Sequence, residues 1–302
     1  MSLCKDVRMA LKESFEDKLF KDDNDFSLFE LSDNLFEPID LSHQEELFRG
    51  KNSSVPIRYS HICSSVIFTY NIFGNKIIEF IKDSKLVKLG SYKIEYEKAY
   101  TNLFNHSQTL FDAVLSNESN NIYFFEIKFT EWICNCKKLL TENYLNPKMY
   151  NDLKTGEIIV KLIKDVVETE KEKVDTKGLK KYGSKYKVLD VFQIIRNTSA
   201  LLDNLDKLAF YNKNIVTLNL LYWNIVNAND CKHLDLVSDL NSRFSFLEKE
   251  FNDFKKTLYT YVKPLFENKD IEFKINLVKF TDFISIMKLT EHHIAFLDRY
   301  RF

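Results

Sequence analysis

The segment IYFFEIKFTEW (residues 122–132) constrains the fold more than any other part of the chain. Its first residues are apolar at odd and even positions alike, which is typical of a strand covered on both faces. Such a strand lies in the centre of a sheet, with other elements packed above and below it. The sequence therefore predicts an α/β fold in which helices flank a central sheet.

The segments around this strand have alternating strand-like and helical patterns. SYKIEYEKAY (91–100) alternates apolar and charged residues, TLFDAVLS (109–116) follows, and NESNN (117–121) has the residues of a chain reversal. We expect further strands at 215–223 and 271–280, a helical pattern over 56–81 that Gly74-Asn75 interrupts, helices over 157–173, 188–210 and 236–266, and a short closing helix. Helix, three meandering strands, helix and strand is thus the predicted order for residues 56–225.

Charged side chains interrupt the central strand at one place. Glu126 and Lys128 are two residues apart, so they project to the same face of the strand, whereas Ile127 projects to the other. A reversal at 117–121 folds the preceding strand alongside and brings Asp112 towards them. Two converging carboxylates suit Mg²⁺, which prefers oxygen ligands. A charged lysine beside them is costly to bury unless it has a role.

The triplet Glu-x-Lys is not specific by itself. It occurs four times in the chain, at Glu16/Lys18, Glu126/Lys128, Glu267/Lys269 and Glu272/Lys274. Only the second of these lies in a hydrophobic strand with an aspartate on the strand before it. A cross-strand ion pair on a half-exposed sheet is the alternative interpretation, although exposed ion pairs stabilise a protein little.

These residues resemble a known group of enzymes. DAVL (112–115) followed by YFFEIK (123–128), in this order of elements, is similar to the PD-(D/E)XK nuclease superfamily. SSVIFTYNIFG (64–74), with FDAVL and FEIKFTEW, resembles more narrowly a group of uncharacterised bacterial restriction endonucleases. The similarity covers residues 56–225, and Phe111 stands where the motif has proline.

The resemblance implies a fold and a division of the chain. We expect an α/β restriction-endonuclease-like core, a mixed central sheet flanked by helices in the order αβββαβ, over residues 56–225. Residues 1–55 are then an acidic, Phe-rich N-terminal extension, and residues 226–302 a mainly helical C-terminal addition packed on the core.

The resemblance also implies roles for individual residues. Asp112, Glu126 and the backbone carbonyl of Ile127 would hold Mg²⁺, for which Mn²⁺ can substitute. Lys128 would position or deprotonate the attacking water and stabilise developing negative charge. Some members add a further acid, and the sequence leaves three candidates open: Glu79, Glu95 and Glu97.

A second functional feature is the basic segment KGLKKYGSKYK (177–187), which contains no acid. Lysines neutralise phosphates and tyrosines, here Tyr182 and Tyr186, stack on bases or donate hydrogen bonds. The residues predicted to bind nucleic acid are Lys177, Lys180, Lys181, Tyr182, Lys185, Lys187 and, on the helix that follows, Gln193. A solvated lysine-rich loop is the alternative for the segment, and an ordinary polar helix position is the alternative for Gln193 and its neighbour Arg196.

The charge distribution bears on the nucleic-acid hypothesis. A formal net charge of −1 by itself weighs against a nucleic-acid binder, which usually has a basic excess. The positions of the charges along the chain weaken this objection. Residues 13–40 carry ten acids and two lysines, a net of −8, so the remainder is basic. Phenylalanines and leucines among these acids predict that the segment packs its apolar side chains on the body and turns its carboxylates to water.

Other features restrict the context. Five scattered cysteines, including Cys134 and Cys136, predict reduced thiols rather than a disulfide framework or a zinc site. The charged N-terminus resembles no signal peptide, and no apolar run is long enough to span a bilayer. We therefore expect a cytoplasmic protein without a membrane partner. No cluster of metal-ligating residues accompanies His292 and His293 in the sequence, which favours a surface or packing role over a ligand role. Ser64 and Ser65 have packing or phosphate contact as alternatives.

Together the sequence predicts a Mg²⁺-dependent endonuclease that hydrolyses DNA phosphodiester bonds, of the restriction or defence type. The alternative is a non-catalytic nucleic-acid-binding or assembly subunit that keeps the nuclease fold. The sequence does not distinguish DNA from RNA, and a homodimer is an expectation from the resemblance alone.

Overall fold

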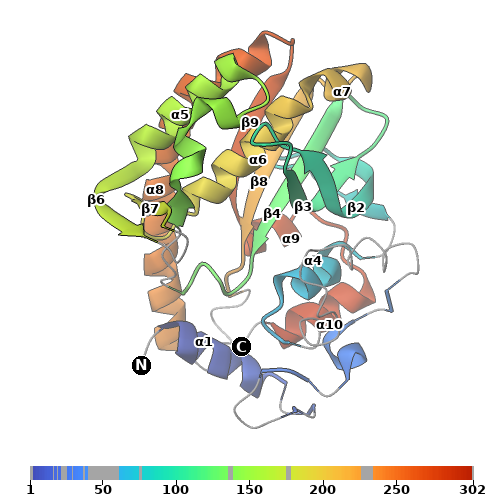
Figure 1. Cartoon of the computed structure of the whole chain (residues 1–302). Coiled ribbons are helices and arrows are strands. Elements are labelled where there is room, and N and C mark those ends of the chain that lie inside the picture. The colour runs from blue at the N-terminus through green and yellow to red at the C-terminus, as the bar shows by residue number, and fades with distance from the viewer. Residues whose placement is uncertain are drawn as a thin grey trace.

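A computed structural model gives the architecture of the chain (Figure 1). It describes residues 3–15, 17–18, 20–21, 26–28, 30–36, 38–39, 61–74, 77–134, 139–174, 178–225 and 234–300. Predictions that concern Lys177, Cys136 or Cys231 lie outside these residues.

The core of the fold is a curled six-stranded mixed sheet in the order β1-β2-β3-β4-β8-β9. The strands are β1 (Ile77–Phe80), β2 (Gly90–Thr101), β3 (Gln108–Ser116), β4 (Asn121–Lys128), β8 (Ile215–Tyr222) and β9 (Glu272–Lys279). Strands β1 to β4 form an antiparallel meander, and β8 and β9 continue the sheet in parallel. Only the two end residues of β4 are less than fully buried, so its predicted central position is confirmed.

Helices cover both faces of this sheet, as the sequence predicts (Figure 1). One face carries α5 (Leu153–Val166), α6 (Val191–Asp203) and the long α8 (Leu234–Glu267), with α7 (Leu205–Phe210) following α6. The other face carries α4 (Ser65–Phe73), α9 (Phe280–Ile284) and α10 (Glu291–Arg299). Stacked aromatic rings join α4 to the end of β4, with the Phe68 and Phe129 centroids 4.2 Å apart. No helix in the described part of the chain is both long and apolar enough to cross a membrane.

Two helix predictions are wrong at their ends. The predicted helix over 157–173 ends at Val166, and the charged run that follows is strand β6 (Val167–Val174). Strand β6 pairs with β7 (Lys180–Ser184), which pairs with β5 (Leu139–Thr141) in a small second sheet. In the pattern over 56–81, the interruption predicted at Gly74 is confirmed, because Gly74 terminates α4 with a positive φ of 73°. The residues after it are not helical, since Ile77–Phe80 form β1.

The described residues of the acidic N-terminal segment pack against the helices on the α4 face. The ring of Phe15 is fully buried and contacts Tyr300, with centroids 5.8 Å apart. The carbonyl of Asn34, in the short helix η1 (Leu31–Asn34), accepts a hydrogen bond from Nδ2 of Asn71 at 3.0 Å. Asp17 points outward and forms an ion pair with Arg299. The predicted arrangement, apolar groups inward and carboxylates outward, is confirmed for these residues.

The cysteines differ from the prediction of reduced thiols. Cys4 in α1 (Leu3–Glu13) forms a disulfide with Cys134, in the turn that follows β4, and their Cα atoms are 5.2 Å apart. The two residues are 130 positions apart, so no local spacing in the sequence predicts the bond. Cys63 is a buried free thiol, and burial raises its pKa to about 12.

Candidate active site

At Glu97, the side-chain alternation of strand β2 is interrupted, so residues before and after it exchange faces of the sheet. Residues four apart on a regular strand share one face. Here, however, the hydroxyl of Tyr96 donates to the Gly74 carbonyl at the end of α4, whereas the ring of Tyr100 packs on Phe124, on the α6 face. Glu97 lies between them and has a left-handed φ of 43°. This irregular residue redirects the strand at the middle of the sheet.

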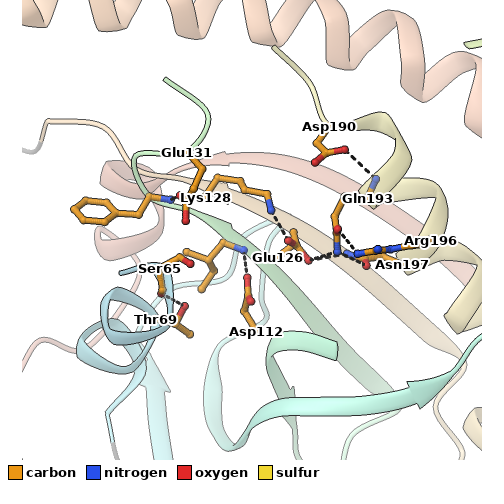
Figure 2. A network of polar contacts seen from close by, with 12 residues as sticks. Ser65, Thr69, Asp112, Glu126, Lys128, Glu131, Asp190, Gln193, Arg196 and Asn197 are labelled. Carbon is orange, nitrogen blue, oxygen red and sulfur yellow. Dashed lines mark hydrogen bonds and ion pairs between the residues drawn. The ribbon is translucent and has the colours of Figure 1, made fainter. Parts of the chain in front are cut away.

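Asp112 lies at the point where β3 and β4 separate. The register of β2 and β3 places Glu97 opposite Asp112, and the ladder between β3 and β4 stops at Ala113. In place of the next ladder bond, Oδ2 of Asp112 accepts the N–H of Ile127 at 2.5 Å (Figure 2). The aspartate therefore joins the two strands beyond the end of their ladder.

The backbone carbonyl of Ile127 faces the same gap. The carbonyl of the next residue, Lys128, accepts a hydrogen bond from the N–H of Trp223 at 2.9 Å, at the end of β8. Carbonyls of successive residues in a strand point in opposite directions, so that of Ile127 points towards β3 and Asp112. The Asp112 carboxylate thus contacts the N–H of Ile127, and strand geometry turns the Ile127 carbonyl to the same side.

Glu126 is buried and held by donors from two elements (Figure 2). Its Oε1 accepts from Nζ of Lys128 at 2.6 Å. Its Oε2 accepts from Nδ2 of Asn197 at 2.9 Å and from Nε2 of Gln193 at 3.3 Å, both on α6. The predicted pair on β4 therefore lies on the α6 face, and α6 supplies its remaining partners.

Helix α6 is built to present these amides. Asp190 caps its N-terminus by accepting the N–H of Gln193 at 3.1 Å. Gln193 and Asn197 are four residues apart, so they share one face of the helix, and Nε2 of Gln193 also donates to Oδ1 of Asn197 at 3.1 Å. Arg196 donates to Oε1 of Gln193 at 2.5 Å. Sequence reasoning identified Gln193 and Arg196 but missed Asn197, whose i, i+4 spacing from Gln193 was the available signal.

We call the three carboxylates of Glu97, Asp112 and Glu126 the acidic cluster. Their charges shift the pKa values of Asp112 and Glu97. Burial, then the charges of Glu126 and Glu97, raise the pKa of Asp112 well above its usual value. Burial and the charge of Glu126 raise the pKa of Glu97 to about 7. Full ionisation of the cluster is therefore unfavourable in the metal-free protein, and a bound cation would favour the charged carboxylates.

Lys128 neutralises one member of the cluster. Burial opposes the charge of its ammonium, but the Glu126 and Asp112 carboxylates outweigh burial and raise its pKa. Burial also opposes ionisation of Glu126, yet Lys128 and Asn197 hold the pKa of this carboxyl below its usual value. Glu126 and Lys128 are therefore a charged pair with hydrogen bonds on both carboxylate oxygens. This differs from the half-exposed surface pair of the alternative interpretation, because Glu126 is only 6% exposed.

The structure distinguishes the three upstream acids. Glu79 forms an ion pair with Lys288 at 2.8 Å, at the edge strand β1. Glu95 forms an ion pair with Lys98 of the same strand. Glu97 alone of the three contributes to the shifted pKa of Asp112, and it is the third acid that the site brings in.

The acidic cluster does not surround a cation position as it stands. In the described ranges, no three or more His, Cys, Asp and Glu side chains are placed to hold a metal ion together. The reason lies in the contacts above: the Asp112 carboxylate is turned to the Ile127 N–H, and Glu126 is turned to Lys128 and α6. A cation would have to take over part of these contacts.

The described part of the basic segment is a strand rather than a loop. Lys180, Lys181 and Tyr182 lie on β7, and Lys185 and Lys187 follow it and lead towards α6. Tyr186 is not available for stacking on a base, which corrects the prediction. Its ring is buried against Phe254, with centroids 5.7 Å apart, and its hydroxyl donates to Asp253 at 2.7 Å.

The remaining candidates have structural partners. Ser64 is the N-cap of α4 and accepts the N–H of Ile67 at 3.4 Å. His293 closes a capping box at the start of α10, and its Nε2 lies 2.9 Å from the carbonyl of Ile72. These contacts agree with the packing interpretations of Ser64 and His293.

Comparison with known proteins leaves the site to be interpreted from its own chemistry. No family model, no curated protein and no solved structure matches the chain. The observations that bear on function are therefore the acidic cluster, the partly exposed Lys128 paired with Glu126, and the amides that α6 directs to Glu126.

Proposed function

We propose that the protein is a divalent-cation-dependent nuclease that hydrolyses phosphodiester bonds of DNA, with residues 56–225 as a restriction-endonuclease-like core. One observation carries the proposal. At the separation of β3 and β4, Asp112 accepts the N–H of Ile127, Glu126 pairs with Lys128 on the same strand, and the charges of Glu126 and Glu97 act on Asp112. This combination of oxygen donors and one ammonium suits cation-assisted attack on a phosphodiester.

The residues present fit a hard divalent cation such as Mg²⁺, with Mn²⁺ as its substitute. Asp112, Glu126 and the Ile127 carbonyl would hold it, and Glu97 would add a further carboxylate. All are oxygen donors, which is the ligand type that Mg²⁺ prefers. When bound, such a cation lowers the pKa of a water ligand and offsets charge on the phosphate.

The chain's own residues supply the rest of the chemistry. Lys128 keeps its proton, so its role is to orient a water or to stabilise negative charge on the phosphate rather than to accept a proton. Gln193 and Asn197 hold Glu126 in place. Arg196 is exposed, is bonded to Gln193, and is the cation on this face best placed to contact a phosphate.

The basic residues of β7 and its C-terminal turn support a nucleic-acid substrate. Lys180, Lys181, Lys185 and Lys187 lie on a segment that runs directly into α6, and Tyr182 lies among them. Lysines spaced in this way can follow a phosphate backbone. Action on both strands by a homodimer and a restriction or defence role are further parts of the proposal, as is a cytoplasmic location.

The test is cleavage by the purified full-length protein. Labelled single- and double-stranded DNA and RNA are incubated with Mg²⁺ or Mn²⁺, alongside Asp112→Asn and Lys128→Met. We expect wild-type cleavage and a loss of at least about 100-fold in both variants, because each removes a charge that acts in the transition state. Glu79→Gln is the matched control, since its carboxylate pairs with Lys288 away from the acidic cluster.

Two results would contradict the proposal. One is a wild-type protein that cuts neither DNA nor RNA with either cation; the other is cleavage that persists unchanged in both variants. A cation titration addresses the alternative of a non-catalytic binding subunit. Such a subunit should have no Mn²⁺ site that Glu126→Ala removes, whereas a nuclease should lose the site with this substitution.

A further inference from the structure

A buried carboxylate on the C-terminal helix holds the segment that precedes α6. Glu250 lies near the middle of α8 and is 9% exposed. Its two carboxylate oxygens accept three consecutive backbone N–H groups, from Lys187 at 2.6 Å, Val188 at 2.9 Å and Leu189 at 2.9 Å. Burying a carboxylate is costly unless it is fully hydrogen-bonded, and here three donors converge on it.

The next turn of α8 holds the same segment from its other end. Asp253 accepts the hydroxyl of Tyr186 at 2.7 Å, and the ring of Tyr186 packs on Phe254. Two carboxylates three residues apart on one helix therefore hold the side chain of Tyr186 and the backbone of residues 187–189. Chain regions about 60 residues apart are joined here by charged hydrogen bonds, which are stronger and more directional than neutral ones.

The fixed segment determines where α6 begins. Leu189 is followed by Asp190, the N-cap of α6. The first turns of α6 then carry Gln193 and Asn197, whose amides hold Glu126 at 3.3 and 2.9 Å. A continuous set of contacts thus runs from Glu250 through the segment and the helix to the acidic cluster.

We propose that Glu250 is a positioning residue for the acidic cluster, acting through residues 187–189 and α6. Without its three hydrogen bonds the start of α6 can shift, and hydrogen bonds to Glu126 weaken with small displacements of the donor. Its expected effect on cleavage rests on the proposed function, whereas its effect on cation affinity does not require catalysis.

A purely structural role predicts something different. Helix α8 has an apolar face that is buried along its length, at Leu240, Phe244, Leu247, Phe251, Phe254, Leu258, Val262 and Phe266. This face attaches the helix to the body without Glu250. If Glu250 only stabilised the fold, its substitution would lower the melting temperature and leave the affinity of the folded site for cations unchanged.

The experiment compares Glu250→Gln with Glu248→Gln in the full chain. Glu248 is exposed on the same helix, so it controls for the loss of one charge. Binding of Mn²⁺ is measured by electron paramagnetic resonance, and amide hydrogen exchange is followed by mass spectrometry. We expect Glu250→Gln to weaken Mn²⁺ binding by about 10- to 100-fold and to speed exchange in residues 187–197, while Glu248→Gln matches wild type.

A conservative variant and a double variant keep the inference testable if Glu250→Gln folds poorly. Glu250→Asp retains the carboxylate but shortens its reach, so we expect a smaller loss of Mn²⁺ affinity than for Gln. Adding either substitution to Asn197→Ala should cost less than it does in wild type, because both act on Glu126 through α6. Fully additive losses would place Glu250 outside this path.

The outcomes separate this inference from the proposed function. Wild-type protein that binds Mn²⁺ but cuts no nucleic acid overturns the nuclease proposal, while an affinity loss in Glu250→Gln still supports the positioning role. If wild type cleaves nucleic acid, and folded Glu250→Gln has the same Mn²⁺ affinity and the same cleavage rate as wild type, the positioning role alone is overturned. Wild-type protein without Mn²⁺ binding overturns both.

Discussion

At the scale of single residues, the acidic cluster is an unfavourable arrangement that the fold maintains. Glu97 is a non-glycine residue with φ of 43° in the interior of a strand, a conformation that costs on the order of 1 kcal/mol or more. Its neighbour across the ladder, Asp112, is half-buried, and the charges of two further carboxylates raise its pKa together with burial. Backbone strain and charge repulsion at the same point are typical of a functional site rather than of a sheet optimised for stability.

The raised pKa of Glu97 predicts how the stability of the metal-free protein depends on pH. The pKa is about 7 in the folded chain, above its usual value of 4.5, because burial and Glu126 disfavour the charged form. The folded state therefore binds this proton more tightly than the unfolded state does. Stability from it is complete below the usual value and is lost as pH rises through about 7. Glu97→Gln should remove that loss, so at about pH 8 the variant should be more stable than wild type by roughly 1–2 kcal/mol.

Urea unfolding at about pH 5 and pH 8, in the presence of a chelator, measures this difference. The variant and wild type should have similar unfolding free energies at the lower pH and should separate at the higher one. Glu118→Gln, at the exposed turn between β3 and β4, is the matched control. A variant that is less stable than wild type at the higher pH would contradict the prediction.

At the scale of elements, the sequence predicted the large sheet better than the small one. Strands β2, β3, β4, β8 and β9 were recognisable because their apolar residues alternate or run continuously. Strand β6, by contrast, has the sequence VETEKEKV, and β7, its partner among the described strands, is a basic segment. Charged side chains on both sides of a strand carry no burial signal, so pairing with another strand decided its structure.

The candidate site shows the same limit of local patterns. Spacing on one strand placed Glu126 beside Lys128, and the chain reversal brought Asp112 close. Spacing did not select Glu97 from three candidates, because its role depends on one left-handed residue and the resulting change of face. Nor did it predict the contacts of Asn197 or Glu250, which reach across 71 and about 60 residues of sequence. These contacts follow from tertiary packing.

Helix α5 gives a prediction at this scale, at a glycine near its start. A Cβ built on Gly156 would lie 2.7 Å from Cβ of Tyr150 and 3.1 Å from the carbonyl oxygen of Pro147. Alanine normally stabilises a helix relative to glycine by about 1 kcal/mol, but overpacking costs about 1–3 kcal/mol. Gly156→Ala should therefore lower the free energy of unfolding. Gly183→Ala on β7, where a Cβ meets nothing within 4 Å, should change it little, and equal effects in urea unfolding would refute this prediction.

At the scale of the whole molecule, the N-terminal segment and the C-terminal helix α10 pack together on the α4 side of the sheet (Figure 1). Tyr70 of α4 donates to the carbonyl of Pro38 at 3.0 Å, and Phe36 packs on Phe296 of α10 with centroids 5.5 Å apart. Cys4 is bonded to Cys134 after β4. The described part of the acidic segment is thus joined to α4 and to the C-terminal helix, and the disulfide joins α1, which precedes it, to the turn after the central strand. Asp17, one of its described acids, pairs with Arg299 of α10.

A substitution of Phe15 tests whether the N-terminal segment and the sheet unfold as one unit. Its ring is fully buried between Tyr300 and the guanidinium of Arg299, which lies 4.9 Å from the ring centroid. Phe15→Ala should lower the free energy of unfolding by about 3–5 kcal/mol, the usual cost of removing a buried phenylalanine. Phe246→Ala is the matched control, because Phe246 is 42% exposed on α8.

The buried Trp132 and Trp223 lie beyond the ends of β4 and β8, so their fluorescence reports on the sheet. If the N-terminal segment and the sheet are one cooperative unit, fluorescence and far-UV circular dichroism will shift to lower urea together. A transition that leaves the fluorescence midpoint unchanged would mean that the segment unfolds separately from the sheet.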